Sequence, residues 1–366
     1  MSNGDAGIPT LMKQIPEVIA RERNFLIVLM CGFLVSAATY RTPMVAAWVG
    51  FAFAAYSAIA NDSIQTIGTF ITSNRKTSWW VLWLFMGGIF LATATYSFIN
   101  FDGDVSYQRL ASKGFETAPA EFSFLQVAAP LFLLVLTRLR MPVSTTFLLL
   151  TSFATDASSV GKVLTKSLTG YALAFGVAVI VWMAISRIID RWMTKEAHPA
   201  WRVAQWVISG ILWSVWLQQD AANIAVYLPR SLSLPQFFVF AGAIFLGLGL
   251  LFRMGGEKVQ EIVDEKSGVV DVRAATVIDF VYAIILYYFK FVSNVPMSTT
   301  WVFLGLLGGR ELAMALRGSS GHRWTIAAKM IGKDALFAGI GLAVSVILAA
   351  SVNDPFRDEV AKFFGL

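Results

Sequence analysis

The chain has 366 residues, of which 57% are hydrophobic and 14% are charged, whereas about 25% of residues are charged in an ordinary soluble domain. Uncharged stretches of about 20 residues recur along it, and each is long enough to cross a bilayer as a helix. With one cysteine, Cys31, this composition excludes a soluble enzyme, a secreted disulfide scaffold and a disordered protein. We predict an all-α, multi-pass membrane protein.

The net charge of +6 reflects membrane topology rather than nucleic-acid binding, because Lys and Arg lie in short loops beside apolar segments. We therefore expect the lipid bilayer and no nucleic acid as a partner. The loop over 101–121 is net acidic and is expected outside, whereas the basic linker over 187–202 is expected inside. The plasma or inner membrane is the expected location.

The predicted elements begin with a surface segment over 1–23 and an extra first transmembrane helix over 24–41. Two sets of five apolar segments follow, in 42–186 and 203–353, with the linker 187–202 between them and a tail over 354–366. The segments of the first set are 42–61, 77–101, 122–137, 141–155 and 167–186. Those of the second are 203–219, 231–252, 274–293, 297–309 and 326–353.

Two short motifs occur once in each set, which indicates an internal repeat. An Asp-x-x-Gln/Asn motif begins at Asp62 and again at Asp220, and a Pro-x-Ser-Thr-Thr motif begins at Pro142 and again at Pro296. The distance from Asp to Pro is 80 residues in the first set, from 62 to 142, and 76 in the second, from 220 to 296. Because each set has an odd number of segments, the second copy is expected to run upside down. Inverted repeats whose interrupted or re-entrant helices form a site near the membrane midplane are typical of secondary transporters.

Asp62 and Asp220 each follow an apolar run of about 20 residues without another charge, and a carboxylate inside a membrane requires a cation, a proton or water. The amide at i+3 shares the carboxylate's helix face. Such oxygens suit Na⁺, whereas the carboxylate alone could carry a proton instead; a third interpretation is that each Asp only caps a helix. We predict a coupling-cation site with Na⁺ or H⁺ near Asp62 and Asp220, formed by Asn61, Asp62, Gln65, Asp220 and Asn223.

The Pro-x-Ser-Thr-Thr motifs predict an anion site built from neutral donors. Proline interrupts a helix and suits the first turn of the next one, which the hydroxyls beside it can cap. Backbone N–H groups at a helix start attract anions, although such hydroxyls can also bond back to carbonyls or pack between helices. Neutral donors bind phosphate and sulfate alike, but a nearby carboxylate favours phosphate, whose P–OH group can donate. The predicted anion-binding residues are Ser144, Thr145, Thr146, Ser298, Thr299 and Thr300.

Two further charges, Asp279 and Lys290, lie within an apolar segment. Eleven residues of helix separate them by about 16 Å, which is too far for an ion pair. Lys290 could contribute positive charge to the anion site, or both residues could simply complement the helix dipole while the lysine snorkels. No Gly-x-x-x-x-Gly-Lys-Ser/Thr loop is present, so we expect no ATP-driven pumping. No His-Glu-x-x-His or Cys-x-x-Cys cluster is present either, so we expect neither an enzyme nor a cofactor.

At these residues the sequence resembles the inorganic phosphate transporter (PiT) family of cation-coupled phosphate symporters. The matching positions are Ala60, Asn61, Asp62, Gln65, Gly68 and Thr69, then Pro142 to Thr146, then Asp220, Ala222 and Asn223, and finally Pro296 to Thr300. The resemblance implies that Asp62, Gln65, Asp220 and Asn223 bind the coupling cation and that the six Ser and Thr residues hold phosphate. It also implies a homodimer that works by alternating access.

Three other functions remain open from the residues alone. A sulfate or other oxyanion permease of the same fold would need few changes in the site. A passive anion channel would not accumulate its ion against a gradient, and a membrane-embedded receptor or scaffold would not transport at all.

Overall fold

A computed structural model describes residues 8–112, 114–139, 141, 143–154, 156–193, 196–254, 271–292, 295–318 and 324–365. Side chains within these ranges are described except at 8–21, 63–65, 186–193, 326–327, 355, 360 and 363–364. The predicted site residue Gln65 therefore has a described backbone only, and Pro142 lies outside the described residues. Every regular element in these ranges is a helix, which confirms the all-α prediction.

The elements before the linker are α1 (Ile8–Thr39), α2 (Pro43–Ser73), α3 (Trp79–Asn100), η1 (Arg109–Ala111), α4 (Phe124–Arg138), α5 (Thr145–Leu148), η2 (Leu150–Phe153) and α6 (Ala157–Met193). Those after it are α7 (Ala200–Ala225), α8 (Leu234–Met254), α10 (Val272–Val292), α11 (Thr299–Leu316), α12 (Trp324–Val352) and α13 (Asp354–Phe364).

Seven of the described helices contain an apolar stretch long enough to cross a membrane, and α4 is a shorter apolar helix. Large apolar side chains such as Phe238, Leu246 and Ile347 are more than 60% exposed, as expected where lipid rather than water is the surrounding solvent. The chain is a multi-pass integral membrane protein.

Several helices run past the predicted segment boundaries. α1 is one helix across residue 24, and α6 continues to Met193, so it includes the first part of the predicted linker. More important for the site, α2 continues past Asp62 to Ser73, and α7 continues past Asp220 to Ala225. Both carboxylates therefore lie inside helices, so the interpretation that each Asp caps a helix is wrong.

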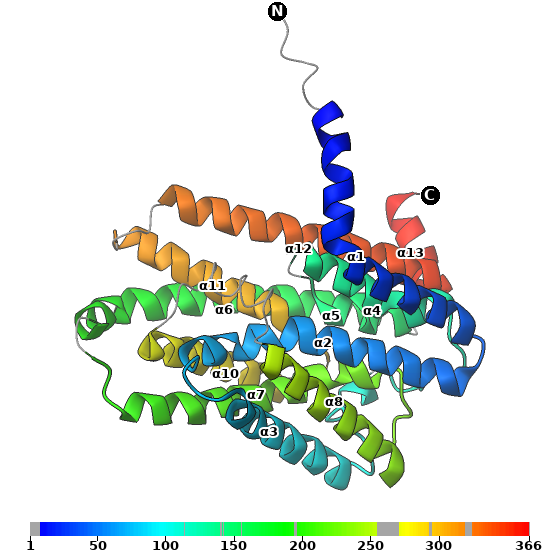
Figure 1. The fold of residues 1–366 in the computed structure, drawn as a ribbon, viewed down its shortest axis with the longest axis horizontal. Coiled ribbons are helices and arrows are strands. Elements are labelled where there is room, and N and C mark those ends of the chain that lie inside the picture. The colour runs from blue at the N-terminus through cyan, green and yellow to red at the C-terminus, as the bar shows by residue number, and fades with distance from the viewer. Residues whose placement is uncertain are drawn as a thin grey trace, which may run out of the picture.

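The two Asp-bearing helices, α2 and α7, pack against each other in the middle of the bundle (Figure 1). α3 and α8 pack together on one side of this pair, and α6, α11 and α12 lie on the other. Packing in one half has a counterpart in the other: α2 contacts α4 and α8, and α7 contacts α10 and α3.

Helices α6 and α11 approach most closely at two glycines one turn apart, Gly305 and Gly309. A methyl group added at either glycine would overlap a backbone carbonyl of α6, that of Tyr171 or Phe175 respectively. Small residues at i and i+4 let the backbones of membrane helices come together in this way. The close contact fixes the start of α11, which carries the second Ser-Thr-Thr motif, against α6.

Candidate functional site

Four polar segments meet in the interior of the bundle: the two Asp motifs of α2 and α7, and the two Ser-Thr-Thr motifs that begin α5 and α11. Each of their described side chains is at most 3% exposed. Burying so many polar groups is costly unless they are paired with one another or with a ligand. The side chains that meet are those of Asn61, Asp62, Ser144, Thr145, Thr146, Asp220, Asn223, Ser298, Thr299 and Thr300.

Both oxygens of Asp62 accept hydrogen bonds from its own half of the chain. The Asn61 amide donates to Oδ1 at 2.8 Å, and the Thr145 hydroxyl donates to Oδ2. The same Asn61 amide lies 3.4 Å from the carbonyl oxygen of Val143. The first Asp motif thus holds the start of α5, and neutral donors stabilise its carboxylate.

Asp220 accepts fewer hydrogen bonds than Asp62 and lies among other acceptor oxygens. The Asn223 amide donates to Asp220 Oδ1 at 2.7 Å. Asp220 Oδ2, Asn223 Oδ1 and Gln219 Oε1 are buried without a hydrogen bond of ordinary geometry within the described part of the chain, although the Thr299 hydroxyl lies near Asp220. Hard cations are bound by such carboxylate and amide oxygens. The sequence prediction did not include Gln219, although it directly precedes Asp220.

The two halves are joined directly at the site. The Asn223 amide also donates to the Thr146 hydroxyl at 3.2 Å, and that hydroxyl lies 3.1 Å from the carbonyl oxygen of Met297. Asp62 and Asp220 are close enough to repel each other electrostatically. A cation between two buried carboxylates would relieve that repulsion.

The remaining hydroxyls shape the helix starts. Ser144 Oγ accepts the N–H of Phe147 at 3.2 Å, and Ser298 Oγ accepts the N–H of Trp301 at 3.2 Å, so both serines are N-caps. The chain is non-helical directly before each cap, as expected beside proline. Thr299 Oγ1 accepts from the indole of Trp216 at 3.3 Å. The two capped helix starts lie close together, because the Thr146 hydroxyl donates to the carbonyl oxygen of Met297.

The sequence prediction missed a buried arginine next to this region. Arg109, in η1, is 1% exposed, and its Nε lies 3.4 Å from the carbonyl oxygen of Gln218, two residues before Asp220. Burial lowers the pKa of Arg109 to about 10, and the neighbouring Asp220 carboxylate opposes that shift. Nothing in the local sequence distinguishes Arg109 from a loop arginine in water.

The predicted contributor Lys290 does not contact the motifs directly. Its ammonium lies 5.0 Å from the centre of the Tyr107 ring, which is a cation–π contact two residues before η1 begins. Asp279, on the same helix, is buried and does not serve as a simple dipole partner. Thr69 donates to its Oδ1 at 2.7 Å and Ser209 donates to its Oδ2 at 2.5 Å, so Asp279 joins α2, α7 and α10.

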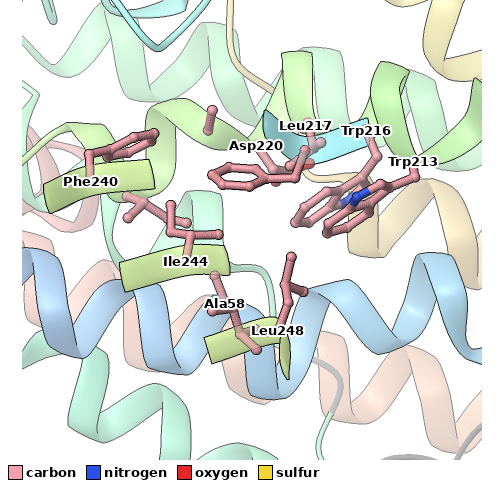
Figure 2. A pocket seen from close by; sticks show the side chains of 12 residues that line it. Ala58, Trp213, Trp216, Leu217, Asp220, Phe240, Ile244 and Leu248 are labelled. Atoms are coloured by element: carbon pink, nitrogen blue, oxygen red, sulfur yellow. The ribbon is translucent and has the colours of Figure 1, made fainter. Parts of the chain in front are cut away.

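A small cavity adjoins Asp220 (Figure 2). It has a volume of about 20 Å³ and lies between α2, α3, α7 and α8. Apart from Asp220 its walls are apolar, and they include the stacked rings of Trp213 and Trp216, 4.9 Å apart. This space holds one water at most, so it is too small for an oxyanion.

No known family profile matches the sequence, and no curated protein matches it. Among solved structures, the chain is similar to one described as "The sodium-dependent phosphate transporter". The match has a TM-score of 0.54 and 16% sequence identity, and it covers 85% of this chain and 97% of that one. In its fold, this helical membrane protein is therefore similar to a sodium-dependent phosphate transporter.

Proposed function

We propose that the protein is a secondary active transporter that carries inorganic phosphate together with Na⁺ by alternating access. The observation that carries this proposal is the meeting of two Asp motifs and two Ser-capped helix starts in one buried site. The similarity of the fold to a sodium-dependent phosphate transporter supports the same substrate and ion.

Phosphate suits the mixture of groups in the site. The N–H groups at the starts of α5 and α11, with the hydroxyls of Thr146 and Thr300, are donors for its charged oxygens. Asp62 and Asp220 are acceptors, which a protonated phosphate oxygen can satisfy and sulfate cannot. This difference favours phosphate over sulfate as the substrate.

Na⁺ suits the acceptor oxygens that surround Asp220. Asp220 Oδ2, Asn223 Oδ1 and Gln219 Oε1 are all buried acceptors without a donor of ordinary geometry in the described part of the chain. A proton would satisfy only one of them, whereas a metal ion can be bound by several oxygens at once. Na⁺ is therefore preferred over H⁺ as the coupling ion.

Alternating access is supported by the burial of the site and by the internal repeat. Because no described motif side chain is more than 3% exposed, helices must separate before an ion from either side can enter. Matched motifs and matched helix contacts, α2 with α4 and α7 with α10, fit two inverted halves that rock around a central site. The proposal includes a homodimer in the plasma or inner membrane.

The test is uptake of radiolabelled phosphate into proteoliposomes that contain the purified protein. An inward Na⁺ gradient is expected to drive phosphate above its equilibrium level, and an equal K⁺ gradient is not. Uptake that only reaches equilibrium would indicate a passive channel, and a Na⁺-driven uptake of sulfate in place of phosphate would indicate an oxyanion permease. Uptake driven by a pH gradient alone would replace Na⁺ with H⁺.

A further inference from the structure

We propose that Arg109 is an anion-recognition residue of this site and that, with Lys166 and Lys290, it lines a basic entrance beneath the loop 101–121. The substrate class is a tetrahedral oxyanion with at least one negative charge. This inference rests on the proposed function and adds to it a residue and a direction of entry.

The loop that carries Arg109 is built to hold it in place. Tyr107 and Gln108 have φ values of +54° and +60°, which residues other than glycine adopt at a cost that surrounding contacts must offset. Asp104 accepts the N–H groups of Ser106 and Gln108 at 2.7 Å each. The Tyr107 hydroxyl donates to the carbonyl oxygen of Thr93 on α3 at 2.7 Å. This turn directs Arg109 inward against α7 instead of outward to solvent.

The loop is also attached to the other half of the chain. Arg230 donates to the carbonyl oxygens of Phe115 at 3.0 Å and Thr117 at 2.8 Å, and the N–H of Leu232 donates to the carbonyl of Gly103 at 3.0 Å. The loop therefore covers this end of α7. An anion that enters from this side passes Arg109 before it reaches Asp220 and Thr299.

Two lysines from different helices, Lys166 and Lys290, lie near Arg109. Lys290 of α10 lies over Tyr107, two residues before Arg109. Lys166 of α6 donates to the carbonyl of Val295, and its neighbour Ser167 accepts the N–H of Ser298 at 2.8 Å. Both lysines lie within electrostatic range of Arg109. Lys166 thereby lies beside the second Ser-Thr-Thr motif, whereas Lys290 lies beside the turn that carries Arg109.

This charge distribution links the anion to the cation. Arg109 contacts the carbonyl oxygen of Gln218 and lies close enough to Asp220 for their opposite charges to attract each other. When a coupling cation neutralises Asp220, the buried guanidinium loses a counter-charge, and an oxyanion then becomes its favourable partner. A guanidinium can also bind two oxyanion oxygens with parallel N–H groups, which an ammonium cannot do.

The test is equilibrium binding of radiolabelled inorganic phosphate to the purified full-length protein at saturating Na⁺. We expect Arg109→Gln to weaken phosphate binding at least tenfold without weakening Na⁺ binding in the absence of phosphate, and Arg109→Lys to restore part of the affinity. Arg273→Gln is the matched control, because Arg273 is another buried arginine, and its guanidinium donates to the Asp271 carboxylate. It is expected to lower the melting temperature and leave phosphate affinity within twofold.

Phosphate affinity within twofold of the original in Arg109→Gln would overturn the inference, whereas failure of the unsubstituted protein to bind phosphate would overturn the proposed function instead. If Arg109→Gln does not fold, Lys290→Gln provides the second variant, since its side chain is only partly buried. It is expected to slow phosphate association several-fold at low ionic strength and to flatten the salt dependence. An unchanged association rate would contradict the basic entrance.

Discussion

Thr146 and Asn223 are joined by a hydrogen bond of 3.2 Å although 77 residues separate them in the chain. Thr146 belongs to the hydroxyl motif of the first half, and Asn223 belongs to the carboxylate motif of the second. The same Asn223 amide bonds Asp220 at 2.7 Å. A change at the proposed anion site is therefore transmitted to the proposed cation site through a single side chain.

Thr146→Val is expected to reduce the coupling between the two ligands while preserving the side-chain shape. The variant removes the hydroxyl that accepts from Asn223, so Na⁺ should increase phosphate affinity less than it does in the unsubstituted protein. Phosphate binding measured over a range of Na⁺ concentrations checks this. Thr165→Val is the control, because the Thr165 hydroxyl is exposed and donates to the carbonyl of Gly161 in its own helix.

Asp62→Asn and Asp220→Asn are each expected to lower Na⁺-driven phosphate uptake at least a hundredfold. Each substitution removes a negative charge from a site that is proposed to hold a cation, and an amide also introduces a donor where a metal ligand is needed. Uptake into proteoliposomes is the measurement, with protein content and melting temperature determined for each variant. Uptake that stayed normal in both variants would refute the assignment of the cation site.

Asp279→Asn is expected to destabilise the fold by about 1–3 kcal/mol, because it places an amide donor against the hydroxyls of Thr69 and Ser209, which both donate to the carboxylate. Thermal unfolding in detergent checks the effect. Asp354→Asn, at an exposed ion pair with Arg357, should cost less than about 1 kcal/mol. Equal stability losses in the two variants would show that the Asp279 contacts add nothing.

The pH dependence of phosphate binding is expected to follow the protonation of Arg109. Burial lowers the pKa of Arg109 to about 10, so the guanidinium is charged at pH 7 and loses its proton as pH rises through about 10. In the described part of the chain, Asp220, Lys166 and Lys290 are the titratable groups within its electrostatic range. Phosphate affinity should therefore fall above pH 10, and in Arg109→Lys the fall should begin at lower pH. Identical alkaline profiles in both proteins would contradict this.

The sequence allowed the membrane class and the motif positions to be predicted because both depend on local patterns. Charge-free runs predict spanning helices, and serine after proline predicts the N-caps found at Ser144 and Ser298. The position of Arg109 could not be predicted in the same way, because it depends on a turn that is held by α3 and by Arg230. Likewise, Asp279 looked like a dipole partner because its two hydroxyl donors come from other helices.

Gly305 and Gly309 bring α11 so close to the backbone of α6 that any side chain at either position would overlap it. The two helices therefore have no room to slide or turn against each other. We expect Ser298 and Lys166 to move together, as parts of one rigid block, in the proposed transport cycle. In that cycle we therefore expect the helices to separate elsewhere, at contacts such as that between Thr146 and Met297.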